Sequence, residues 1–112
     1  MNKCHFVGML ADDPHLVNIN NTYLVTFTLA IEDHRKDKDG SKKRRVDFLR
    51  FEAWATGAQT IDKHAHKGDF MAVESIARQS TSHQEKKSDT ITFRVTNFKI
   101  FNNNKLNEDD EK

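Results

Sequence analysis

The sequence contains a single cysteine, Cys4, among its 112 residues. One cysteine excludes an internal disulfide and a zinc site built from cysteines, which leaves Cys4 as a small apolar residue in a strand. The chain also lacks an apolar run long enough to span a membrane, and its first residues, MNKCHFVGML, lack the long apolar core of a signal peptide. We therefore expect a cytoplasmic protein.

The patterns that carry catalysis or bind a cofactor are missing as well. We find no glycine-rich phosphate loop, no nucleophile elbow and no HExxH helix. His64 and His66 stand two apart, so on a helix they point about 200 degrees from each other and cannot share a metal. Asp12 and Asp13 precede Pro14, which is typical of a turn. The sequence therefore predicts neither an enzyme nor a metal or cofactor site.

The composition is that of one globular domain with polar loops. Hydrophobic residues make up 36% of the chain and charged residues 31%. A length of 112 residues allows a single core and is too short for two. Residues 102–112 show no pattern and too little apolar surface to order themselves. We expect a domain at residues 1–101, followed by a flexible acidic tail at residues 102–112.

Five segments rich in β-branched and aromatic residues predict five strands, at about residues 3–10, 23–32, 46–55, 69–78 and 89–101. The second alternates regularly, with Val25, Phe27 and Leu29 on one face. The last alternates through Phe93 and then changes phase near Asn97, which indicates a β-bulge.

One short helix is expected between the third and fourth strands, within residues 56–68. Ala58, Ile61 and Ala65 follow helical spacing, Thr56 is a suitable N-terminal cap, and Gly68 suits a left-handed stop. Five strands with a helix in this position are the element order of an OB-fold, a small Greek-key barrel that binds oligonucleotides or oligosaccharides. An SH3-like barrel also has five strands, but the helix favours the OB-fold.

The stretch RRVDFLRFEAWA, residues 44–55, combines aromatic and charged side chains on one face of the third strand. The apolar face carries Leu49, Phe51, Ala53 and Ala55, and the other face carries Phe48, Arg50, Glu52 and Trp54. Charged faces normally meet water, so these two aromatics are either exposed or packed under a neighbouring loop.

Charge is unevenly distributed although the net charge is only +1. Residues 33–45 hold seven Lys or Arg against three Asp, a local charge of +4, whereas residues 105–112 hold two Lys against four acids, a local charge of −2. The basic run indicates either an anionic partner or a solvated hairpin tip.

Three segments carry a resemblance to a known family: NKCHFVGMLADDPH (2–15), VTFTLAIEDHRKDKDG (25–40) and RVDFLRFEAWATGAQTIDKHAHKGDFMAVE (45–74). In order and spacing they resemble the bacterial and phage single-stranded DNA-binding proteins of the SSB type, over about residues 2–101. The resemblance implies that Phe48 and Trp54 stack on bases with Arg50 between them, and that the basic hairpin embraces the DNA. It implies basic contacts from Lys3 and Lys67, and His34 or Arg35 in place of a tryptophan that many members have. The full set of DNA-binding residues expected is Phe48, Arg50, Trp54, Lys3, His34, Arg35, Lys36, Lys38, Lys42, Lys43, Arg44, Arg45, Lys67 and Arg78.

The chain departs from this family at several positions. Ser82 and His83 stand where many members have another tryptophan, and Ser75 replaces a glycine that usually follows the glutamate of the fourth strand. The ending NEDDEK is acidic but lacks the apolar tip through which bacterial members recruit replication and repair proteins. Replication and recombination proteins remain candidate partners, but we do not expect their recruitment by that route.

The resemblance implies a non-enzymatic protein that binds and protects single-stranded DNA with little sequence specificity during replication, recombination or repair. Base stacking on aromatics and phosphate contacts from basic residues are the two interactions that such binding needs. The resemblance also implies a homo-oligomer, a tetramer or a dimer, in which the N-terminal strand pairs with its copy. The alternative is a dimeric OB-fold adaptor, similar to the primosomal replication protein, that bridges replication proteins. An oligosaccharide-binding module is a third possibility, which the basic loop argues against.

Overall fold

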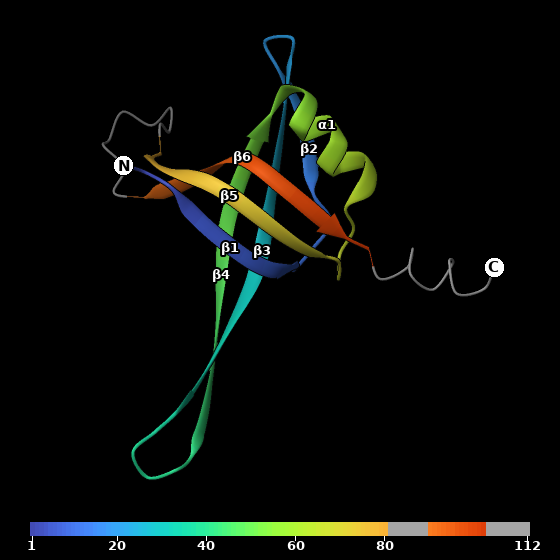
Figure 1. Ribbon diagram of the computed structural model, residues 1–112. Helices are drawn as coiled ribbons and strands as arrows, with labels where there is room; N and C mark the ends of the chain where they lie inside the picture. Colours follow the sequence, from blue (N-terminus) through green and yellow to red (C-terminus); the bar gives the residue numbers. More distant parts are fainter. Residues whose placement is uncertain (81–89, 103–112) are drawn as a thin grey trace, which may run out of the picture.

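A computed structural model describes residues 1–80 and 90–102 of the chain. Six strands and one helix run through this part (Figure 1). They follow the order β1 (Cys4–Leu10), β2 (His15–Ile19), β3 (Thr22–Lys36), β4 (Lys42–Trp54), α1 (Ala55–His64), β5 (Phe70–Gln79) and β6 (Ile91–Phe101). The described residues contain no helix that is long and apolar enough to cross a membrane.

The strands close into a five-strand barrel. Neighbouring strands pair in the order β1-β5-β6-β4-β3-β2, and an additional pairing of β1 with β3 completes the ring. All pairs are antiparallel except β4 with β6, where Phe51 pairs with Phe93 and Glu52 with Arg94. The arrangement confirms the predicted all-β OB-fold with its helix in the expected place.

The sixth strand, β2, was not predicted, because its five residues HLVNI stand between two turn signals. β1 and β2 pair with the same edge of β3 one after the other, with Leu10 opposite Leu29 and His15 opposite Thr26. The two segments therefore occupy a single position in the barrel, and the ring still has five positions.

The hairpin of β3 and β4 is longer than predicted and extends well beyond the barrel (Figure 1). The two strands stay in register from Leu24 opposite Trp54 to Lys36 opposite Lys42. A short turn then closes the hairpin, with Gly40 in the left-handed region at a φ of 86°. The basic run is thus mostly a two-stranded ribbon rather than a loop. We call its projecting part, residues 31–47, the arm.

The core lies inside the barrel and follows the predicted alternation. Val25, Phe27 and Leu29 of β3 are buried. Phe51 of β4 lies at the centre, because its ring contacts those of Phe6, Phe27 and Phe93 at centroid distances of 5.4, 5.4 and 5.5 Å. Such aromatic pairs stabilise the barrel beyond the burial of their apolar area.

The helix differs from the prediction at both ends. It begins at Ala55, so the exposed Ala55 does not face the barrel as a strand residue, and no side chain caps the helix. The predicted cap, Thr56, lies inside the first turn, where its carbonyl accepts a hydrogen bond from Thr60 Oγ1 at 3.0 Å. Gly68 is left-handed as expected, at a φ of 94°, but stands in the turn beyond the helix C-cap, Ala65.

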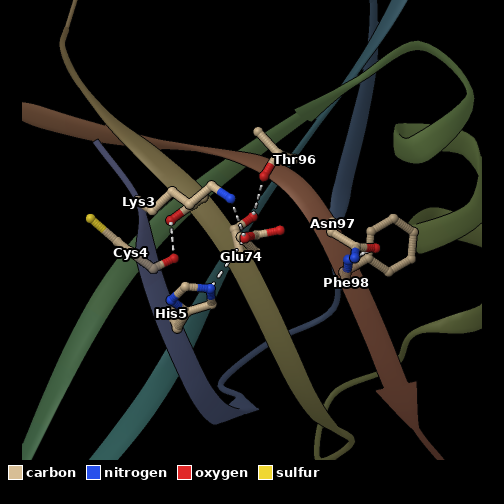
Figure 2. Close-up of polar contacts among 8 residues, drawn as sticks. Lys3, Cys4, His5, Glu74, Thr96, Asn97 and Phe98 are labelled. Atoms are coloured by element: carbon tan, nitrogen blue, oxygen red, sulfur yellow. Dashed lines mark hydrogen bonds and ion pairs between the residues drawn. The ribbon is translucent and has the colours of Figure 1, made fainter. Parts of the chain in front are cut away.

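The bulge predicted near Asn97 is confirmed. Glu74 pairs with Asn97 and Ser75 with Val95, so Thr96 is the extra residue of β6. Its Oγ1 donates a hydrogen bond to the carbonyl of Glu74 at 3.1 Å (Figure 2). Beside the bulge, Ser75 is fully buried and its Oγ donates to the carbonyl of Cys4 at 3.4 Å. The serine that departs from the family pattern is therefore accommodated in the interior.

The end of β6 is fastened to the start of β5 by a buried carboxylate. Asp69 is 3% exposed, and its Oδ2 accepts hydrogen bonds from Asn102 Nδ2 at 2.7 Å and from the backbone N–H of His66 at 2.9 Å. Asn102 is the only residue of the predicted tail within the described part.

Candidate nucleic-acid interface

The outer face of β4 carries a row of aromatic and charged side chains on the barrel itself. Phe48 is 65% exposed and Arg50 is exposed, whereas Trp54 is half-buried. Their partners on β3 are small, with Ala30 opposite Phe48 and Thr28 opposite Arg50. Short neighbours leave the ring of Phe48 uncovered, so one face of it is accessible to a flat ligand.

Trp54 is less accessible than Phe48 because β6 covers part of it. The guanidinium carbon of Arg94 lies 6.0 Å from the centroid of the indole ring, which is within cation–π range. The indole Nε1 is buried and has no hydrogen-bond partner among the described residues. The sequence left open whether these two aromatics are exposed or packed. In the structure Phe48 is exposed, and Trp54 is partly packed.

The same outer face continues along the arm. His34 pairs with Arg44 and Lys36 with Lys42, in the same phase as Phe48 and Arg50. An uninterrupted surface therefore leads from the aromatic row to the tip of the hairpin.

A carboxylate occupies part of this basic surface. Glu32 accepts hydrogen bonds from Arg44 Nε and Nη2, each at 3.1 Å, and lies 3.1 Å from His34 Nε2. The hydrogen bond from Arg44 lowers the pKa of Glu32 and raises the pKa of Arg44. Arg44 and His34 thus share a local counter-ion, whereas Lys36 and Lys42 form no ion pair in the described part of the chain.

Three of the predicted DNA-binding residues lie on the opposite face of the arm. Arg35 and Lys43 are partners across the ribbon, and Arg45 pairs with Asp33. Each has an acidic neighbour: Arg35 and Lys43 lie 3.7 and 3.8 Å from Asp37, and Arg45 lies 3.1 Å from Asp47. The basic run therefore presents two faces, only one of which continues the aromatic row.

The remaining predicted cations are dispersed. Lys38 stands in the turn at the tip of the arm. Lys3 lies 3.5 Å from Glu74 and so sits over β1 and β5 rather than on β4 (Figure 2). Lys67 stands in the turn after α1, where its backbone N–H donates to Asp13 Oδ1 at 2.8 Å. Ser82 and His83 lie outside the described residues.

Arg78 is the predicted cation that β5 brings beside the aromatic row. It lines a cleft of about 110 Å³ between β4, β5 and β6, together with Glu52 and Arg94. Arg94 was missed in the sequence, although a signal was present: it is the one charged residue between the inward-facing Phe93 and Val95 of the last strand. Its Nε lies 3.4 Å from Glu52 Oε1.

A second exposed surface lies on the other side of the barrel, where β1, β5 and β6 adjoin. It carries four large apolar side chains and encloses a depression of about 620 Å³. The apolar side chains are Val7 at 62% exposure, Met9 at 39%, Phe70 at 44% and Phe101 at 46%. Glu74 borders the depression and lies 3.2 Å from His5 Nε2 (Figure 2). We call this surface the β1–β5 face.

No group of three metal-ligating side chains lies close together in residues 1–80 and 90–102.

Comparisons with known proteins agree on one family. The model of the single-strand binding protein family matches residues 1–108. Single-stranded DNA-binding protein 1 of Streptococcus pyogenes serotype M6 is 30% identical over 78 residues, which make up 69% of this chain and 58% of that protein. The single-stranded DNA-binding protein of Enterococcus faecalis is 30% identical over 86 residues, 76% of this chain and 44% of that protein.

Among solved structures, a deletion mutant of the single-stranded DNA binding protein from Thermus aquaticus matches with a TM-score of 0.79 and 21% identity. The match covers 92% of this chain and 51% of the other. At this identity it supports the fold alone. The chain spans about half the length of the proteins that it matches.

Proposed function

This chain belongs to the single-strand binding protein family, and from that premise we propose that it binds single-stranded DNA with little sequence specificity and protects it during replication, recombination or repair. The family is non-catalytic. The proposal includes the cytoplasmic location expected from the sequence, since bacterial DNA is copied and repaired there.

One observation carries the mechanism: the exposed ring of Phe48 stands beside Arg50, which forms no ion pair within residues 1–80 and 90–102, and both are in phase with the basic outer face of the arm. Stacking on an aromatic ring contributes about 1–3 kcal/mol per base and accepts every base, because all four have a π-face. Lys and Arg side chains bind phosphates without regard to sequence. A surface with both features binds a strand and not a particular sequence.

Titration of the protein with a long oligothymidine tests this function. Trp54 is the only tryptophan, so its emission reports on the aromatic row alone. We expect quenching on binding, and an affinity that falls as salt rises, with a logarithmic slope of about −0.7 for each phosphate contact. Fluorescence anisotropy of a labelled oligothymidine gives the same affinity without relying on Trp54.

The titration also separates the proposal from the adaptor alternative. An adaptor that bridges replication proteins would leave the anisotropy of the oligothymidine unchanged at low salt while still binding a replication protein. That result would overturn single-stranded DNA binding as the primary function.

We further propose that the protein assembles with copies of itself through the β1–β5 face. Four exposed apolar side chains lie there together. Single apolar residues are common on protein surfaces, but a contiguous group of them marks an interaction site. Moreover, β1 pairs with β3 only at Met9 and Leu10, so residues 4–8 have one edge that no strand pairs with in the described part of the chain. An open strand edge pairs readily with its own copy, which gives a symmetric interface.

Mass measurement in solution tests the assembly. Val7→Lys places a charge within the apolar face and is expected to lower the measured mass towards that of a monomer, 13.0 kDa. Ile19→Lys is the matched control, because Ile19 is also exposed, at 40%, but lies on β2. A wild-type protein that is already monomeric at micromolar concentration would refute this proposal and leave DNA binding untouched.

A further inference from the structure

The cleft between β4, β5 and β6 has the composition of an anion site. Its lining comes from all three strands and is almost entirely polar: Glu52, Arg78, Gln79, Ser80, Thr92 and Arg94. Two guanidinium groups and one carboxylate line the cleft, which leaves a local charge of +1. Ser80 and Thr92 add hydroxyl donors. A phosphodiester carries one negative charge and accepts several hydrogen bonds, so it matches both features.

The two arginines are held differently. Arg94 is placed by the parallel pairing of β4 with β6, which sets it opposite Glu52, and its Nε lies 3.4 Å from the carboxylate. Its side chain is still 40% exposed. Arg78 is exposed and has no carboxylate partner among the described residues. One guanidinium is thus oriented in advance, whereas no carboxylate in the described part of the chain holds the other in place.

Arg94 also connects the cleft to the aromatic row. Its guanidinium carbon lies 6.0 Å from the centroid of the Trp54 ring, so one side chain borders both places. In a nucleotide only the sugar separates the base from its phosphate. A base stacked against Trp54 therefore brings its phosphate within reach of the cleft.

From this juxtaposition we propose that the cleft is a phosphate subsite, in which Arg78 and Arg94 hold the phosphodiester of the nucleotide whose base stacks against Trp54. The inference rests on the proposed binding of single-stranded DNA and deepens it. In this subsite the carboxylate of Glu52 orients Arg94. It also weakens phosphate binding, because it partly neutralises the positive charge of the two arginines.

Four variants test the subsite by anisotropy titration with oligothymidine over a range of salt. Arg78→Gln and Arg94→Gln should each weaken binding roughly tenfold, as expected for a hydrogen bond to a charged group. Each should also make the logarithmic salt slope shallower by about 0.7. Lys63→Gln removes the same charge from the exposed surface of α1 and is the matched control. Glu52→Gln should have the opposite effect on affinity, with tighter binding at every salt concentration.

The double variant Glu52→Gln with Arg94→Gln separates a phosphate contact from a purely structural ion pair. If Arg94 only neutralises Glu52, the double variant binds like the wild type. If Arg94 contacts phosphate, the double variant binds more weakly than the wild type, and roughly tenfold more weakly than Glu52→Gln alone. Thermal unfolding of each variant confirms that it is folded. Arg78→Gln breaks no ion pair among the described residues, so it remains decisive if Arg94→Gln unfolds.

The outcomes distinguish this inference from the proposed function. Wild-type protein that fails to bind oligothymidine overturns both. Wild-type protein that binds, with Arg78→Gln and Arg94→Gln indistinguishable from Lys63→Gln, overturns the subsite and leaves the proposed function standing.

Discussion

Replacing Phe48 separates the binding role of its ring from any role in stability. Because the side chain is 65% exposed, only about a third of it is buried. Full burial of a phenylalanine contributes about 1.5–3 kcal/mol, so Phe48→Ala should lower the free energy of unfolding by roughly 0.5–1 kcal/mol. Loss of one stacked base costs about 1–3 kcal/mol, which corresponds to a roughly 5- to 150-fold weaker Kd. Binding should therefore suffer more than folding.

Two further substitutions at the same position make the test specific to stacking. Phe48→Leu keeps an apolar side chain but removes the flat ring, whereas Phe48→Trp enlarges the ring. We expect Phe48→Leu to bind oligothymidine nearly as weakly as Phe48→Ala, and Phe48→Trp to bind at least as tightly as the wild type. Anisotropy titration at one low salt concentration gives the Kd of each variant, and thermal unfolding gives its stability.

Two results would refute the reasoning. Wild-type affinity in Phe48→Leu would mean that apolar area, rather than a π-face, holds the strand. Unfolding of Phe48→Ala would mean that the ring belongs to the core, against its exposure in the structure.

Three more predictions follow from individual contacts. Glu32→Gln should tighten DNA binding and steepen the logarithmic salt slope by about 0.7, because it releases Arg44 for a phosphate; an unchanged slope in the anisotropy titration would contradict this. Arg44→Gln should return the pKa of Glu32 towards its ordinary value of 4.5, as measured by an NMR pH titration. Since the ion pair lowers that pKa, its stabilisation of the arm is complete above pH 4.5 and is lost as the pH falls through the lowered value. Gly8→Ala should lower the Tm, because its Cβ would lie 2.8 Å from the carbonyl oxygen of Ala30 and 2.9 Å from Ile31 Cγ1, an overpacking that costs about 1–3 kcal/mol; an unchanged Tm would show that the barrel yields there.

The barrel was predictable because its signal is periodic and long. Val25, Phe27 and Leu29 alternate with polar or small residues over most of β3, and only a strand with one buried face produces that pattern. The bulge at Thr96 was found in the same way, since an extra residue shifts the phase of the alternation.

The arm and β2 were not predictable from alternation. In the arm both faces are charged, so residues 33–36 and 42–45 show no apolar period, and they form strands because each hydrogen-bonds to the other across the hairpin. β2 has only five residues and lies between two turns, so its alternation is too short to reveal a strand that pairs with β3.

The candidate interface also contains one part that the sequence revealed and one part that it did not. Phe48 was identifiable because an aromatic among charged neighbours is conspicuous within one strand. The pairing of Glu52 with Arg94 joins residues 42 positions apart, and it depends on where β6 meets β4. No local sequence pattern predicts where these two strands pair, so the polar cleft could be recognised only from the structure.

Not all the basic residues of the arm are equally available to DNA, because carboxylates of the arm compete with phosphates for some of them. Four of the seven cations have a carboxylate neighbour: Arg35, Lys43, Arg44 and Arg45. Three have none in the described part of the chain: Lys36, Lys38 and Lys42. Exposed ion pairs contribute only about 0–1 kcal/mol, so exchanging a carboxylate for a phosphate costs little energy. Each exchange, however, leaves a carboxylate near the phosphate that replaced it. Seven independent contacts imply a salt slope of about −5. The paired arrangement of the arm therefore predicts a shallower salt dependence from these residues.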